Sequence, residues 1–134
     1  MTNLAIKEML LADEDQQHLQ NKGYSFAVAQ DSGFVCLVIR DFALASRYTP
    51  TVCDLLLRLP PNFPMAKPDM FWTYPHVKMI TGNYPPQADV LDINYDGRRW
   101  QRWSRHLNAC QWRPGKDSLR TFLGIIRSEL QEGI

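Results

Sequence analysis

The chain has 134 residues, which is the length of one ordinary domain, with a core that needs neither metals nor disulfides. Hydrophobic residues make up 45% and charged residues 22% of it, values that exclude a disordered chain. The 15 Lys and Arg residues nearly balance 14 Asp and Glu residues, so the net charge of +1 does not favour a polyanionic partner. No apolar run approaches the roughly 20 residues that cross a bilayer, and we expect no membrane partner.

The cysteines and histidines indicate neither disulfides nor a metal. Cys36, Cys53 and Cys110 are an odd number without close pairing, and no signal peptide opens the chain. These features predict a cytoplasmic protein. The three histidines are scattered and no Cys-x-x-Cys is present, so we expect no metal site.

Residues 3–22 are predicted to be helical in two steps. A first amphipathic piece ends at Leu11, and Asp13 is placed to cap a second piece that stops at Gly23.

Strands follow this helical region. Large apolar residues alternate with smaller residues from residue 24, and after a turn signal at 31–33 a continuous apolar run extends to residue 39, which together predict a hairpin. The apolar run 51–59 predicts a third strand. The four prolines of the 60–68 segment predict an ordered, extended loop that leads into a short fourth strand at 71–72. The four strands form an antiparallel meander.

The last third of the chain is predicted to hold a long loop and a helix. Residues 75–99 are rich in Pro and Gly and show little periodicity, which indicates a long functional loop. Asp117 or Ser118 is placed to cap a closing helix. Its apolar residues recur at helical spacing: Leu119, Phe122, Leu123, Ile126 and Leu130.

Two passages carry a resemblance to a known family. Residues 57–72 read LRLPPNFPMAKPDMFW, and residues 111–123 read QWRPGKDSLRTFL. In this order they resemble the Leu-Pro-x-x-Tyr-Pro-x-x-Pro-Pro and Gln-Trp-Ser-Pro passages of the ubiquitin-conjugating enzyme fold. The resemblance covers about residues 13–132, and the chain is most similar to the bacterial members encoded beside ubiquitin-like proteins and activating enzymes.

The resemblance implies an α+β fold in one domain over 1–134. Its parts would be an N-terminal helix, a four-stranded antiparallel meander, an irregular active-site segment and a C-terminal helix. It also implies a conjugating enzyme that accepts the C-terminal acyl group of a ubiquitin-like protein from an activating enzyme and transfers it to a target protein. No cofactor is expected, because the adenylation chemistry belongs to the activating enzyme.

The chain departs from the family at the position that carries the acyl group. Conjugating enzymes of eukaryotic type have a His-Pro-Asn signature before a catalytic cysteine, which stands eight residues ahead of the Trp of Trp-Ser-Pro. Here residues 75–77 read Pro-His-Val, and the residue eight positions ahead of Trp112 is Ser104. The resemblance therefore places a hydroxyl where a thiol is expected.

Ser104 and His106 are our first candidates for catalysis. Serine needs a base to remove its proton, and residues two apart share a face of an extended segment, so His106 is placed to act as that base. The hypothesis is an oxyester of the modifier on Ser104. The alternative is that both are polar residues of a solvated loop.

Cys110 is the competing nucleophile. It lies in the same segment, and nearby Arg113 and Lys116 would lower the pKa of its thiol. It stands only two residues before Trp112, however, and its alternative role is that of a buried structural thiol. Cys36 and Cys53 are expected in the core because they lie in predicted strands.

Two other functions stay open. A catalytically inactive scaffold that binds a ubiquitin-like protein or an activating enzyme is favoured by the loss of the aligned cysteine. Arginines also surround Trp100 and Trp103, which are spaced to lie on one helical face as a docking surface. Such a cluster is also typical of single-strand nucleic-acid binding, but because the chain as a whole is not basic we do not expect a nucleic-acid partner.

Overall fold

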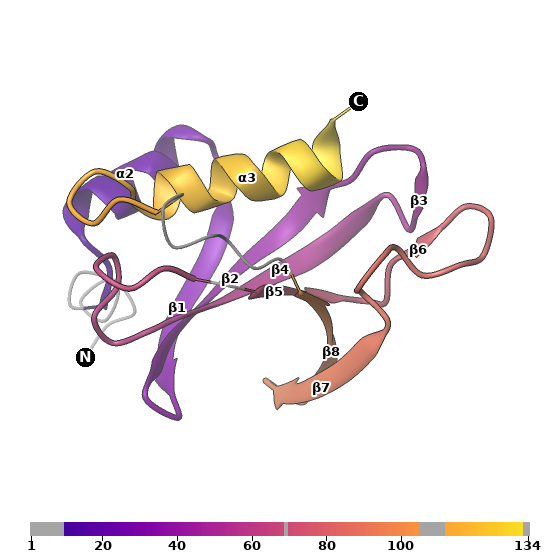
Figure 1. The fold of residues 1–134 in the computed structure, drawn as a ribbon, viewed down its shortest axis with the longest axis horizontal. Helices are drawn as coiled ribbons and strands as arrows, with labels where there is room; N and C mark the ends of the chain where they lie inside the picture. Colours follow the sequence, from indigo (N-terminus) through magenta and orange to yellow (C-terminus); the bar gives the residue numbers. More distant parts are fainter. Residues whose placement is uncertain (1–9, 69, 105–111, 133–134) are drawn as a thin grey trace.

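The computed structural model describes residues 10–68, 70–104 and 112–132. Two helices lie on one face of a six-stranded antiparallel sheet (Figure 1). The strand order is β1-β2-β4-β5-β8-β7, and β3 and β6 form a separate two-stranded ladder. The bounds are α2 Asp13–Asn21, β1 Ser25–Asp31, β2 Phe34–Ala43, β3 Tyr48–Thr49, β4 Val52–Leu59, β5 Met70–Tyr74, β6 Lys78–Met79, β7 Val90–Tyr95, β8 Arg98–Ser104 and α3 Leu119–Gln131.

The second of the two predicted N-terminal helical pieces is confirmed as α2. Its N-cap residue is Ala12 and not Asp13, which instead stands in the first turn with two further acidic residues near the positive end of the helix. The piece that was predicted to end at Leu11 lies almost wholly outside the described residues. None of the helices that the structure describes is long and apolar enough to cross a membrane.

The four predicted strands are confirmed as β1, β2, β4 and β5. The turn between β1 and β2 places Ser32 and Gly33 at φ values of 52° and 84°. Two successive left-handed residues give a turn whose twist matches that of the strands it joins. Asp31 therefore pairs with Phe34, and the register continues from there to Ser25 and Arg40.

The prediction of a long loop over 75–99 was wrong for its last part. Residues 90–104 form the hairpin β7–β8, whose turn has Asp96 and Gly97 at φ values of 53° and 72°. An Asp-Gly pair between alternating residues is a strong hairpin signal, and it was present in the sequence. The hairpin pairs with β5 through β8 and places β7 at the edge, so it extends the sheet from the four predicted strands to six.

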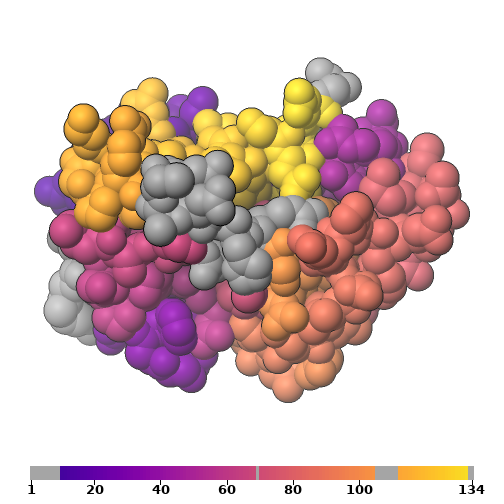
Figure 2. Space-filling view, in the orientation of Figure 1, coloured from indigo at the N-terminus to yellow at the C-terminus, as the bar shows by residue number. Residues whose placement is uncertain are grey.

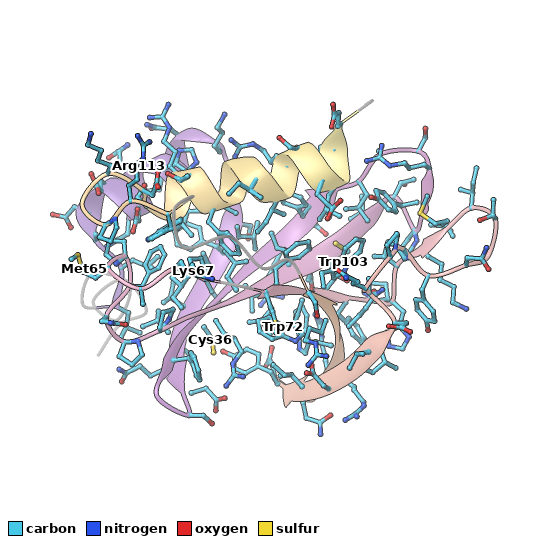
Figure 3. All side chains as sticks on the ribbon, viewed as in Figure 1. Cys36, Met65, Lys67, Trp72, Trp103 and Arg113 are labelled. Carbon is cyan, nitrogen blue, oxygen red and sulfur yellow. The ribbon has the colours of Figure 1, made fainter. Side chains whose placement is uncertain are left out.

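Each face of the sheet carries a separate hydrophobic cluster. The face under the helices holds the large core, which includes Trp103 and the apolar residues of α3. The opposite, helix-free face holds a smaller cluster, made of Cys36, Val38, Leu56, Trp72 and Trp100. Figure 3 shows Trp103 on the helix side of the sheet, and Trp72 and Cys36 on the other side.

The predicted docking surface on Trp100 and Trp103 is wrong. Both residues lie on β8 and both are fully buried. Side chains three apart on a strand point to opposite faces, so the two rings enter different clusters and not one helical face.

Candidate functional site

Ser104 is the last residue of β8, and its side chain is half-buried. It pairs with Met70 of β5, and its backbone N–H donates to the carbonyl of Gln87 at 3.1 Å. Because the neighbouring Trp103 points under the helices, the alternation of the strand places Ser104 on the helix-free side. The candidate carrier thus stands on a paired strand, at its end, next to the loop that precedes β7.

The two other candidates of the catalytic segment, His106 and Cys110, lie outside the described residues and stay predictions. The expectation for the remaining cysteines is confirmed, since Cys36 and Cys53 are both buried. Burial raises the pKa of the Cys53 thiol to about 12 and also raises that of Cys36. Both thiols are therefore protonated at neutral pH, and neither is placed to act as a nucleophile.

Gln101 ties the loop before β7 to the sheet. Its Oε1 accepts hydrogen bonds from the Val77 N–H at 2.6 Å and from the Thr73 hydroxyl at 3.0 Å. Its Nε2 donates to the carbonyls of Val77, at 2.9 Å, and Ala88, at 2.7 Å. The amide is fully buried, and it uses both donors and both lone pairs of its oxygen.

These four hydrogen bonds of the Gln101 side chain, the Gln101 clamp, position the surroundings of Ser104. Val77 and Ala88 stand at the two ends of the loop, and Gln87 next to Ala88 accepts the hydrogen bond from Ser104. Sequence reasoning missed Gln101. The signal was a polar residue at a position that alternation in β8 assigns to the core face, beside a tryptophan.

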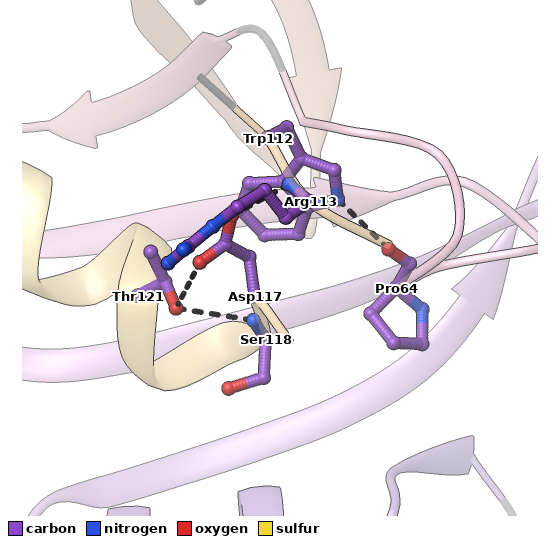
Figure 4. Close-up of polar contacts among 6 residues, drawn as sticks. All are labelled: Pro64, Trp112, Arg113, Asp117, Ser118 and Thr121. Atoms are coloured by element: carbon purple, nitrogen blue, oxygen red, sulfur yellow. Dashed lines mark hydrogen bonds and ion pairs between the residues drawn. The ribbon is translucent and has the colours of Figure 1, made fainter. Parts of the chain in front are cut away.

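Trp112 anchors the other side of the catalytic segment. Its Nε1 donates a hydrogen bond to the Pro64 carbonyl at 2.8 Å (Figure 4). The centre of its ring lies 6.0 Å from the centre of the Phe63 ring. The proline-rich loop therefore packs against the residue that begins the approach to α3. Trp112 and Trp72 are both buried, so each of the two passages that carry the family resemblance brings its tryptophan into the interior.

A buried carboxylate organises the start of α3. Asp117 accepts a hydrogen bond from the Arg113 backbone N–H at 2.6 Å and another from the Thr121 hydroxyl at 3.4 Å. Thr121 also accepts from the backbone N–H of Ser118, the N-cap residue, at 3.2 Å (Figure 4). The turn before the helix is thus bound to its first turn, which holds Trp112 and α3 in one arrangement.

Most of the arginines near this site that the structure describes are paired. Arg98 forms an ion pair with Asp54 and Arg102 with Asp92, each at 2.6 Å. The tryptophans among them are buried, so their rings offer no stacking platform for bases.

The Pro75-His76-Val77 segment follows β5. His76 is exposed. Val77 is buried, and its backbone N–H and carbonyl are both hydrogen-bonded to the Gln101 side chain. Among the described residues, no group of three His, Cys, Asp or Glu residues could hold a metal ion.

The comparison with protein families adds the decisive finding. Residues 11–133 match the model described as prokaryotic E2 family E. The chain belongs to prokaryotic E2 family E. This membership confirms the predicted relation to ubiquitin-conjugating enzymes and agrees with the α+β order of helix, antiparallel sheet and helix. Neither the comparison with curated proteins nor the comparison with solved structures found a match for this member of the family.

Proposed function

We propose that this chain conjugates a ubiquitin-like protein to a target through an acyl intermediate on Ser104. The observation that carries the proposal is the match to prokaryotic E2 family E over residues 11–133. Ser104 is favoured as the carrier because it stands eight residues ahead of the anchored Trp112, at the end of a paired strand. A ubiquitin-like protein, its activating enzyme and a target protein would be the partners.

The reaction would have two acyl-transfer steps. The Ser104 oxygen attacks the activated C-terminal carbonyl of the modifier and its proton passes to a base, for which His106 is the candidate. The bond from that carbonyl to the activating enzyme's leaving group breaks, and the leaving group takes up a proton. In the second step an acceptor nucleophile attacks the ester and releases Ser104, which regains its proton.

The described residues contribute position to this chemistry. A serine hydroxyl is a weak nucleophile, so a serine carrier depends on orientation and on a base more than a cysteine carrier does. The ladder from β8 to β5 and the hydrogen bond to Gln87 hold the backbone of Ser104. The alternative carrier of the proposal, Cys110, would form a thioester.

A gel assay with chemical release tests the carrier. The protein is mixed with an activating enzyme, ATP and the ubiquitin-like protein, and the covalent adduct is treated with hydroxylamine or dithiothreitol. A Ser104 ester is released by hydroxylamine and resists dithiothreitol. Ser104→Ala should abolish the adduct and Ser104→Cys should make it sensitive to dithiothreitol, whereas Cys110→Ala should leave it unchanged. An adduct of the wild type that dithiothreitol removes, and that Cys110→Ala abolishes, would assign the carrier to Cys110.

The serine in place of the expected thiol also favours a second candidate, an inactive scaffold. A scaffold would bind the ubiquitin-like protein or the activating enzyme without forming an adduct under any condition. Binding measured by calorimetry, together with no covalent band and no acylated residue in mass spectrometry, would establish this function in place of conjugation.

A further inference from the structure

A pocket of about 200 Å³ opens at the edge of the helix-free face, at the end of the sheet where Ser104 lies. Arg58 of β4 and Met70 and Trp72 of β5 line it, with Phe34 at the start of β2. Pro60, Lys67 and Pro68 of the proline-rich loop complete the wall. The ends of β1–β2 and of β7–β8 project as two lobes with an indentation between them (Figure 2).

Two cationic side chains line the pocket. They are Arg58 and Lys67, and none of the described residues that line the pocket carries a carboxylate. Arg58 forms no ion pair with any described residue, and its Nε is buried without a hydrogen-bond partner among them. Cys36 lies next to Arg58, but burial raises the pKa of its thiol, so it stays neutral and does not compensate the guanidinium charge.

Aromatic rings hold the guanidinium in place. Its central carbon lies 4.4 Å from the centre of the Phe34 ring and 6.0 Å from that of the Trp72 ring. A guanidinium held on rings is pre-organised, so less entropy is lost when it binds a carboxylate.

The size of the pocket limits its ligand. At about 200 Å³ it is smaller than the roughly 300–1,000 Å³ typical of sites for whole cofactors or drug-sized molecules. The space fits one side chain of a larger partner, and the Arg58 guanidinium selects an acidic one.

The pocket is close to the candidate carrier. Met70 lines it and is also the cross-strand partner of Ser104, on the same face of the sheet. Only β5 separates β4, which carries Arg58, from β8, so the two backbones lie roughly 10 Å apart. An extended peptide covers that distance in about three residues.

We propose that this pocket binds an acidic side chain of the target protein, about three residues from the nucleophile that receives the modifier. The inference rests on the proposed conjugating function. It gives Arg58 the part of a specificity residue, which selects the acceptor and takes no part in the chemistry at Ser104.

A binding experiment tests the pocket without any need for catalysis. The probes are the blocked peptides Ac-Ala-Lys-Ala-Ala-Glu-Ala-NH2 and its Gln counterpart, titrated into the whole chain and followed by NMR at the Trp72 indole N–H and the Met70 methyl group. We expect the Glu peptide to bind at least about fivefold more tightly, which is the order of one partly exposed ion pair, and the difference to shrink in 0.5 M salt. Sodium acetate at equal concentration measures the effect of a free carboxylate.

Variants of Arg58 assign the effect. Arg58→Gln should remove the preference for Glu, Arg58→Lys should keep part of it, and thermal unfolding shows that each variant is folded. Equal binding of the two peptides to the wild type, the same preference in folded Arg58→Gln, or no shift at Trp72 and Met70 would overturn the proposal.

A discharge assay separates this proposal from the proposed function. The charged protein should transfer the modifier about fivefold faster to a protein acceptor with Glu three residues from the modified residue than to one with Gln there. If no adduct forms, the conjugating function fails, and with it the acceptor role of the pocket, whereas the titration still decides whether the pocket binds an acidic side chain. If an adduct forms and discharges equally to both acceptors, only the pocket proposal fails.

Discussion

The two faces of the sheet are buried in different ways, and β8 shows the difference within four residues. Trp103 stacks on Phe71 with ring centres 5.3 Å apart, beneath a layer of two helices. Trp100 is equally inaccessible, but it is covered by partly exposed side chains such as Tyr74 and Tyr95. Equal burial of two tryptophans therefore arises from a helix layer on one side and from side chains on the other.

The polar groups of the two faces differ in the same way. Beneath the helices, Gln101 is satisfied by hydrogen bonds to loop backbone and to a buried hydroxyl. On the helix-free face Arg98 lies over the ring of Tyr74 at 4.9 Å, and Arg102 pairs with Asp92 at the rim. The helix-covered side is therefore a closed core with satisfied polar groups, and the opposite side is a surface on which cations lie over aromatic rings.

The largest expected effect is the loss of Trp103. Trp103→Ala should lower the free energy of unfolding by about 4 kcal/mol, because it opens a closed cavity and leaves the Thr73 hydroxyl without the indole donor, which lies 2.9 Å away. Trp100→Ala should cost about 3 kcal/mol, at the low end for a buried tryptophan, since its partly exposed neighbours can close over the space. Urea unfolding of both variants measures this. An equal or larger loss for Trp100→Ala would contradict the difference between the faces.

Removal of the Gln101 clamp is expected to have the next largest effect on the free energy of unfolding. Gln101→Leu should lower the free energy of unfolding by about 3 kcal/mol, because several buried backbone groups lose their partner. Hydrogen exchange at the Val77 amide should rise with it. Thr73→Val is the milder companion variant, which removes the hydrogen bond of the hydroxyl to Gln101 and the one it accepts from the Trp103 indole, and it should cost about 2 kcal/mol. A Gln101→Leu protein as stable as the wild type would show that the clamp does not hold the loop.

The helix-covered side should also carry a pH dependence. Burial raises the pKa of Asp15 to about 6; the charge of Glu14 adds to this, and a hydrogen bond from the Leu119 N–H opposes it. The folded state favours the protonated form, so stability is complete below about pH 4 and falls by about 2 kcal/mol as pH rises through 6.

Asp15→Asn tests this dependence. The variant should be more stable than the wild type by about 2 kcal/mol at pH 8 and equal to it at pH 4, as measured by thermal unfolding. His18 lines the same cleft as Asp15, and its lowered pKa makes the free energy of unfolding rise with pH. Both proteins carry this contribution, so it cancels in the difference between the variant and the wild type. A loss of stability at pH 8 would show that the ionised carboxylate supports the N-terminus of α3.

The smallest effect is expected on the helix-free face. Trp72→Phe removes the hydrogen bond from the indole Nε1 to Asp92, 3.0 Å long, but Asp92 keeps its ion pair with Arg102 and its contact with water. We expect a loss of about 1 kcal/mol in urea unfolding. A loss above about 3 kcal/mol would mean that this face is as tightly packed as the one under the helices.

Much of the fold was predictable from local sequence. Turn residues marked the β1–β2 hairpin, apolar spacing marked α3, and the Pro-rich and Trp-x-Pro passages indicated the family. The hairpin β7–β8 was predictable too, from the Asp96-Gly97 pair. The candidate site was predictable only as a position, since counting back from Trp112 identifies Ser104 but not its neighbours.

The sequence by itself determined the order of the elements and the family, because turns, strand alternation and helical spacing are written in residues close together along the chain. Only the tertiary structure decided that Trp100 and Trp103 face opposite ways, that Gln101 clamps a loop, and that Arg58 lies on the same face of the sheet as Ser104. The partners of Gln101 are 13 to 28 residues distant, and no local spacing encodes them. Such contacts depend on which strands pair, and pairing between distant segments is decided when the whole sheet forms.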